Sequence, residues 1–120
     1  MFYRKIYDRM KAWKEKADGR TALLIEGARR VGKSTVAKAF AENEYAHVLL
    51  IDFSTASPDV VRLFDDLSDL DTFFLQLQLF CHVSLEQRKS VIIFDEVQFC
   101  PRARQAIKHL VADRRYDYIE

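Results

Sequence analysis

The sequence has few cysteines, almost no net charge and no long hydrophobic run. Cysteine occurs twice in 120 residues, as Cys81 and Cys100. These two residues form no C-x-x-C pair, and their spacing to the three histidines matches no metal-binding pattern. We therefore expect reduced, partly buried thiols and a cytoplasmic protein. The formal net charge of +1 offers no electrostatic reason to expect nucleic acid or an anionic membrane as a partner.

Membrane segments are also not indicated. The most apolar stretch, residues 73–83, is interrupted by Gln76 and Gln78 and is too short to span a bilayer. The first sixteen residues contain no apolar core of the kind that a signal peptide needs. A hydrophobic fraction of 49% over 120 residues, without an internal repeat or low-complexity segment, predicts one globular domain with a real core.

The sequence does contain a phosphate-binding motif. Residues 27–34, GARRVGKS, match the pattern G-x-x-x-x-G-K-[ST] at every fixed position. Residues 22–26 predict a short buried strand and residues 33–43 a helix, which is the context that this motif requires. Inward-pointing N–H groups of such a loop surround phosphate oxygens, and the helix N-terminus adds its positive dipole end. Gly27 and Gly32 permit the positive φ angles and close backbone approach of the loop.

Each residue of this segment has a predicted role. Lys33 is placed to reach the β- and γ-phosphates and to act in catalysis, and the Ser34 hydroxyl is placed to bind Mg²⁺. Arg29 and Arg30 either touch phosphates or stay solvated, and Thr35 either lies near the phosphates or is an ordinary helix residue. The predicted nucleotide-binding residues are Gly27, Ala28, Arg29, Arg30, Val31, Gly32, Lys33, Ser34 and Thr35.

A second motif is an apolar strand that ends in two carboxylates. Residues 91–94, VIIF, precede Asp95 and Glu96, and functional side chains of open α/β sheets sit at the carboxyl ends of strands. Asp95 is predicted to hold Mg²⁺ beside Ser34, usually through a bound water, and Glu96 to orient and polarise the attacking water as general base. Without the phosphate motif, the same residues would be read as a strand entering a loop.

Several other polar residues have two interpretations each. Asp52, at the end of the predicted strand 47–53, is either close to Mg²⁺ or a turn residue. Gln98 either senses the γ-phosphate or is an ordinary loop residue. A basic stripe on one helix is either a nucleic-acid surface or, as we favour, a solvated face; it comprises Arg102, Arg104 and Lys108. The three histidines are scattered and receive no role.

The remaining segments complete an α/β pattern. Residues 2–17 predict an amphipathic helix, packed on the edge of a sheet or lying on a membrane surface. Residues 59–67 predict a short helix, and a capping box at residues 68–71 starts another. The expected core face of that helix comprises Leu70, Phe73, Phe74, Leu77, Phe80 and Cys81. A helix over 101–112 and a strand over 116–120 follow, so the order predicts a parallel sheet with right-handed crossovers.

Together the strings GARRVGKST, IDFS and IIFDEVQFCPRARQAIKHLV resemble those of a group of bacterial and archaeal AAA-type ATPases. That group pairs an N-terminal P-loop domain with a C-terminal domain of unknown function. The resemblance implies ATP and Mg²⁺ as ligands, with Lys33, Ser34, Asp95 and Glu96 at matching positions. It also implies that strand 116–120 lies between strand 22–26 and the Asp-Glu strand. We expect a three-layer P-loop NTPase sandwich with a mostly parallel sheet.

The function expected from the sequence is MgATP hydrolysis by in-line attack of water. ATP is favoured over GTP because no N-K-x-D-type guanine-reading motif is visible. The alternative is a nucleotide-responsive interaction module with little hydrolysis, and a small-molecule kinase is a weaker option. We expect one domain over residues 1–120, with a nucleotide-binding core over 20–120. This core is expected to be incomplete at its C-terminus, which would leave one side of strand 22–26 unpaired. The N-terminal helix around Trp13, a second copy of the chain in a homo-oligomer or the remainder of a longer chain would cover it.

Overall fold

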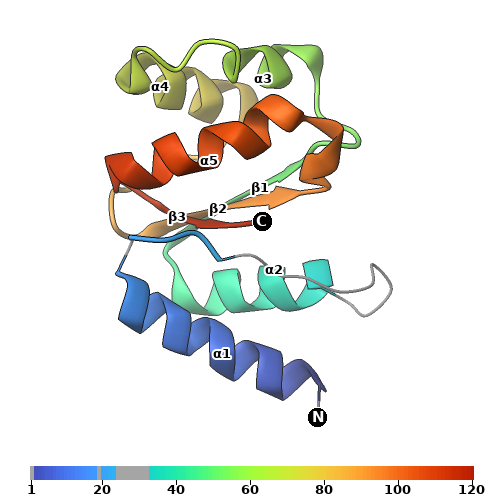
Figure 1. Ribbon diagram of the computed structural model, residues 1–120, viewed down its shortest axis with the longest axis vertical. Coiled ribbons are helices and arrows are strands. Elements are labelled where there is room, and N and C mark those ends of the chain that lie inside the picture. Colours follow the sequence, from blue (N-terminus) through green and yellow to red (C-terminus); the bar gives the residue numbers. More distant parts are fainter. Residues whose placement is uncertain (1, 19, 24–32) are drawn as a thin grey trace.

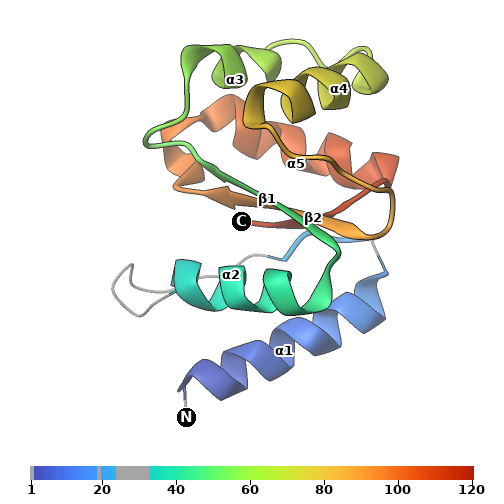
Figure 2. The same cartoon turned by 180° about the vertical axis from the view of Figure 1, so that it is seen from behind.

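The protein is an α/β domain of three layers. The computed structural model describes residues 2–18, 20–23 and 33–120. Helices α1 and α2 cover one face of a parallel sheet, and α3, α4 and α5 cover the other (Figures 1 and 2). The elements in chain order are α1 (Phe2–Ala17), α2 (Lys33–Glu44), β1 (His47–Asp52), α3 (Pro58–Leu63), α4 (Leu70–Cys81), β2 (Ser90–Asp95), the 3₁₀ helix η2 (Val97–Phe99), α5 (Pro101–Asp113) and β3 (Asp117–Ile119). The predicted α/β fold class is confirmed.

The sheet places β2 in the middle of the described strands. The order is β1-β2-β3, and both pairings are parallel. Beyond β3, Leu23 forms an isolated parallel bridge with Ile119, in which the Leu23 N–H donates to the Tyr118 carbonyl at 2.9 Å. Thus β3 lies between β2 and the segment that leads to the phosphate motif, as the resemblance implied. Residues 24–26 of the predicted first strand lie outside the described residues.

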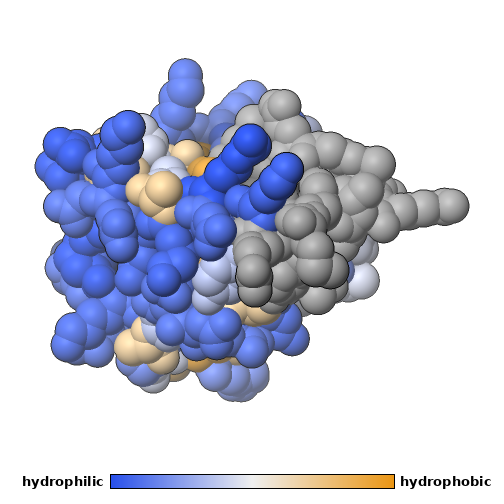
Figure 3. All heavy atoms as spheres, turned by 90° about the horizontal axis from the view of Figure 1, so that it is seen from below, coloured by the Kyte–Doolittle hydropathy of each residue, from blue (hydrophilic) through white to orange (hydrophobic). Residues whose placement is uncertain are grey.

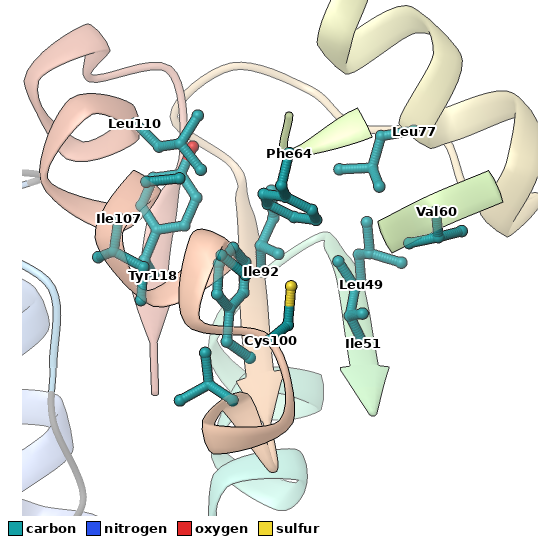
Figure 4. Packing of buried hydrophobic residues seen from close by; sticks show 14 of the residues in the cluster. Leu49, Ile51, Val60, Phe64, Leu77, Ile92, Cys100, Ile107, Leu110 and Tyr118 are labelled. Carbon is teal, nitrogen blue, oxygen red and sulfur yellow. The ribbon is translucent and has the colours of Figure 1, made fainter. Parts of the chain in front are cut away.

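The central strand is apolar because both of its faces are covered. Ile92 and Phe94 belong to the core under α3, α4 and α5, whereas Val91 and Ile93 belong to the core under α1 and α2. All four side chains are buried. Figure 4 shows Ile92 within the first of these cores, with Leu49 from β1 on one side. A parallel strand between two helical layers has no solvent face, so its sequence is continuous rather than alternating.

The connection between α3 and α4 differs from the prediction in two ways. Helix α3 ends at Leu63 rather than at residue 67. After it, the Asp66 carboxylate accepts hydrogen bonds from the Ser68 N–H at 3.0 Å and from its hydroxyl at 2.7 Å. Such local side-chain bonds turn the chain instead of continuing a helix. The cap of α4 is therefore Asp69 rather than Ser68, and its carboxylate accepts from the Thr72 N–H at 3.2 Å.

The core face of α4 is narrower than predicted. Phe73, Phe74 and Leu77 are buried, as expected from their spacing. Phe80, however, is 47% exposed, so its prediction as a core residue was wrong. Only one stripe of an outer helix reaches the layer beneath it, and Phe80 lies one turn beyond the last buried residue of that stripe.

Helix α1 packs against α2. Met10 is buried, the ring of Tyr7 meets Phe40 edge-to-face at 5.5 Å, and the Lys14 ammonium donates to the Glu44 carbonyl at 2.9 Å. Viewed from the α1 side, the coloured surface is mostly hydrophilic (Figure 3). These contacts favour a helix packed on the domain over one on a membrane, although its neighbour is α2 rather than a sheet edge. Among the described helices, none combines the length and apolarity needed to span a bilayer.

Candidate functional site

The candidate site lies at the carboxyl end of the sheet. Asp52 and Asp95 are register partners at the ends of β1 and β2. The Phe53 N–H donates to the Asp95 carbonyl at 2.9 Å, which continues the pairing one step past the strands. Helix α2 begins at this same end (Figure 1). Topology therefore brings Asp95, Glu96 and the first turn of α2 to one edge, where open α/β sheets bind ligands.

Most of the predicted phosphate loop lies outside the described residues. The predicted nucleotide-binding residues outside the described part of the chain are Gly27, Ala28, Arg29, Arg30, Val31 and Gly32. Lys33, Ser34 and Thr35 form the first turn of α2, and the structure describes their helical backbone alone. The structure does show where α2 starts. The N-terminus of this helix lies at the carboxyl end of the strands (Figure 2).

The backbone of Glu96 has an unusual conformation. Its φ of 55° and ψ of 40° lie in the left-handed region, which costs a non-glycine residue on the order of 1 kcal/mol. Two buried neighbours hold it there: Val97 and Cys100 are 8% and 5% exposed, and the Cys100 N–H donates to the Val97 carbonyl at 2.9 Å. The turn begins directly after Asp95, so Asp95 is held by the register of β2 whereas Glu96 belongs to the turn. Four other non-glycine residues in the described part of the chain also have a positive φ, so this conformation marks a turn and is not a site signal by itself.

The Glu96 carboxylate has a hydrogen-bond donor two residues along the chain. The side-chain amide Nε2 of Gln98 donates to Glu96 Oε1 at 3.3 Å. Both residues belong to the turn around η2, and the Phe99 N–H donates to the Glu96 carbonyl at 3.1 Å. The sequence placed Gln98 near the site but did not predict this contact. The spacing E-x-Q is no signal for it by itself, because side chains two apart do not face each other in a regular 3₁₀ turn and Glu96 precedes η2 with a left-handed backbone.

Asp52 forms a turn of its own. Its half-buried carboxylate accepts from the Ser54 N–H at 2.9 Å and from the Ser54 hydroxyl at 2.6 Å. This is the local pattern by which Asp and Ser close a turn after a strand. Of the two interpretations of Asp52, the structure favours the turn residue. The pattern D-x-S was visible in the sequence.

The donor types at this edge suit a hard cation. The described residues contain no group of three or more His, Cys, Asp or Glu side chains arranged to hold a metal. Mg²⁺ needs no such group, because it commonly keeps several waters and takes one or two carboxylates together with substrate phosphates. The carboxylate of Asp95 fits that chemistry. The turn after β2 contains no histidine, and its one cysteine, Cys100, is buried.

The basic stripe on α5 is mostly paired with carboxylates. The Arg102 guanidinium lies 3.0 Å from Asp65, and that of Arg104 lies 3.9 Å from Glu120. Lys108 is exposed. These pairs favour a solvated face over a nucleic-acid surface.

A charged cluster that sequence reasoning missed occupies the opposite end of the sheet. Buried Asp117 accepts hydrogen bonds from the Tyr45 hydroxyl and from Arg88, the latter at 2.8 Å. Burial, with the Asp117 contact second, raises the pKa of Tyr45. A hollow of about 540 Å³ adjoins the cluster and is also lined by Lys14, Asp18 and Arg114. These residues are far apart in sequence, so no local signal could have joined them.

Comparison with known proteins assigns the fold to a family. A family model described as AAA domain matches residues 19–120. The chain belongs to the AAA domain family. As an AAA domain it is of a nucleotide-binding, ATPase type, in agreement with the resemblance noted in the sequence. No curated protein and no solved structure was matched.

Proposed function

We propose that this AAA domain binds MgATP and hydrolyses it by in-line attack of water. The observation that carries the proposal is the position of Asp95 and Glu96. They follow β2 at the edge where α2 begins, and α2 directly follows the GARRVGKS motif. Asp95 ends β2 within the sheet register, whereas Glu96 starts the following turn with a left-handed backbone, and this difference supports different roles for them. Two roles are what the reaction needs, one for the metal and one for the water.

In this proposal the phosphates are held by the loop amides, the α2 N-terminus and Lys33. Ser34 and Asp95 are the residues that would hold Mg²⁺. The bound metal would neutralise charge on the β- and γ-phosphates. Glu96 would accept a proton from the attacking water as it approaches the γ-phosphate. Preorganised amides and Lys33 would stabilise the charge that develops on the transferring group.

The decisive experiment compares the two carboxylates on the purified chain. Glu96→Gln should keep MgATP affinity while phosphate release falls by roughly 10²- to 10⁴-fold, since that is the usual contribution of a general base. Asp95→Asn should instead weaken binding that depends on Mg²⁺. Calorimetry gives the affinities, and a phosphate-release assay gives the turnover. Wild-type turnover in Glu96→Gln would mean that Glu96 is not the base.

Asp52→Asn is the matched control for Asp95→Asn, because both residues end register-paired strands at the same edge. The Asn side-chain oxygen can still accept from Ser54, so this variant should bind MgATP like the wild type. Lys33→Ala tests the loop and should weaken ATP binding by at least about 2 kcal/mol, roughly 30-fold. Binding without any phosphate release in the wild type would identify the domain as a nucleotide-responsive interaction module instead.

A further inference from the structure

We propose that Gln98 is a positioning residue for Glu96, and that its side-chain amide sets the orientation of the carboxylate toward the attacking water. The inference rests on the function proposed above. It starts from the contact between Gln98 Nε2 and Glu96 Oε1 at 3.3 Å. A glutamate side chain has three rotatable bonds, and it samples many rotamers unless a contact restricts it. A donor that binds one carboxylate oxygen reduces the number of rotamers that the side chain can adopt. It thereby also restricts the direction of the second oxygen.

The surrounding turn makes this contact a built feature. Glu96 is held at φ 55°, and the next residue, Val97, is buried beneath it. Gln98 itself is exposed, so it contributes little to the core. Cys100, buried at the start of α5, closes the turn from the other side. Val97 and Cys100 thus anchor the turn in the core, while the Gln98 amide and the half-buried Glu96 carboxylate meet at its surface.

A positioning role differs in its consequences from direct sensing of the γ-phosphate. A sensor touches the nucleotide, so its loss should weaken MgATP affinity relative to MgADP. A residue that orients the base changes the chemical step, so its loss should lower kcat and leave KM and both affinities almost unchanged. The observed contact is with Glu96 and supports the second case.

The first test is a double-mutant cycle on kcat. Gln98→Leu should lower kcat roughly 5- to 20-fold, since the contact is a charge-assisted hydrogen bond at an exposed position. The same substitution should change turnover less than about twofold in the Glu96→Gln background, because the group that it orients is gone. Gln98→Glu should be at least as damaging as Gln98→Leu, since it replaces a donor with a second carboxylate. Gln76→Leu, the same change at an exposed α4 position, is the control and should leave kcat unchanged.

The second test detects the contact between Gln98 and Glu96 by NMR and does not depend on catalytic turnover. The side-chain amide signals of Gln98 in a ¹⁵N NMR spectrum, assigned by their loss in Gln98→Leu, should shift in Glu96→Gln. Those of Gln76 should not. Thermal unfolding should place all variants at the wild-type midpoint, which separates orientation from stability.

The outcomes separate this inference from the proposed function. A wild-type chain that turns over normally, with equal effects of Gln98→Leu in both backgrounds, overturns the role of Gln98 alone. A selective loss of MgATP affinity in Gln98→Leu also overturns it, because Gln98 would then be a sensor of the nucleotide. A Gln98 amide signal that does not shift in Glu96→Gln overturns it as well. A wild-type chain that releases no more phosphate than Lys33→Ala overturns the proposed function and the catalytic role of Gln98 with it.

Discussion

Two buried tyrosines provide a sharp test of the energetics, because the same substitution should have opposite effects at the two positions. The Tyr118 side chain in β3 is 1% exposed, and within the described part of the chain its hydroxyl has no hydrogen-bond partner. Figure 4 shows its ring beside Ile107 and Leu110. The Tyr45 hydroxyl, in contrast, donates to the buried carboxylate of Asp117.

The expected magnitudes follow from these environments. An unpaired buried polar group costs about 1–3 kcal/mol, so Tyr118→Phe should stabilise the fold by about 1 kcal/mol and raise Tm by about 4 °C. A hydrogen bond to a charged group contributes about 1.5–3 kcal/mol, so Tyr45→Phe should destabilise by about 2 kcal/mol and lower Tm by about 8 °C. The Asp117 carboxylate then retains only its Arg88 partner among these contacts.

The pH dependence has a definite sign. Burial raises the pKa of both Tyr45 and Tyr118, so the folded state keeps each proton after the unfolded state has lost it. Stability is therefore fully present below the ordinary tyrosine pKa of about 10 and falls as pH rises above it, by up to about 1.4 kcal/mol per pH unit and per tyrosine. In each Phe variant, folding stability should therefore fall less steeply above this pH, because one of the two titrating tyrosines is gone.

Urea unfolding from pH 8 to 11, followed by far-UV circular dichroism, measures these effects. Tyr116→Phe, whose hydroxyl is not among the buried unpaired atoms, is a matched control in the same strand region and should shift Tm little. Clear destabilisation by Tyr118→Phe would show that its hydroxyl does have a partner. Equal effects of Tyr45→Phe and Tyr118→Phe would refute the reasoning altogether.

Two further predictions concern elements away from the site. Met10→Ala should destabilise the domain by about 2–4 kcal/mol, because it leaves a cavity where α1 meets α2; an unchanged urea midpoint would mean that α1 is not part of the cooperative unit. The hydrogen bond from the Thr72 side chain lowers the pKa of Asp69, so the cap stabilises α4 above the ordinary Asp pKa and this contribution is lost as pH falls below it. Asp69→Ala should therefore reduce stability at pH 7 and have less effect at pH 2.5, whereas an equal loss at both values would argue against the cap.

Local pattern alone was sufficient for much of the fold. The helix over residues 33–44 and the strand that ends at Asp95 depend on neighbours in the chain, so spacing and periodicity predicted them. Pro101 at the start of α5 marked a helix that runs nearly as predicted, to Asp113. The apolar run of residues 91–94 predicted a strand, and the helical layers on both faces of the sheet explain why β2 has no polar side.

Other features depended on which segments meet in space. The exposure of Phe80 follows from how far α4 extends past the core, and the helix sequence does not contain that distance. The cluster of Tyr45, Arg88 and Asp117 joins residues from three separate segments. The left-handed turn at Glu96, and with it the Gln98 contact, exists because buried Val97 and Cys100 hold a backbone that local preference disfavours. The sequence therefore determined which residues are candidates for the site, while tertiary packing decided the conformation of the turn that holds Glu96 and Gln98.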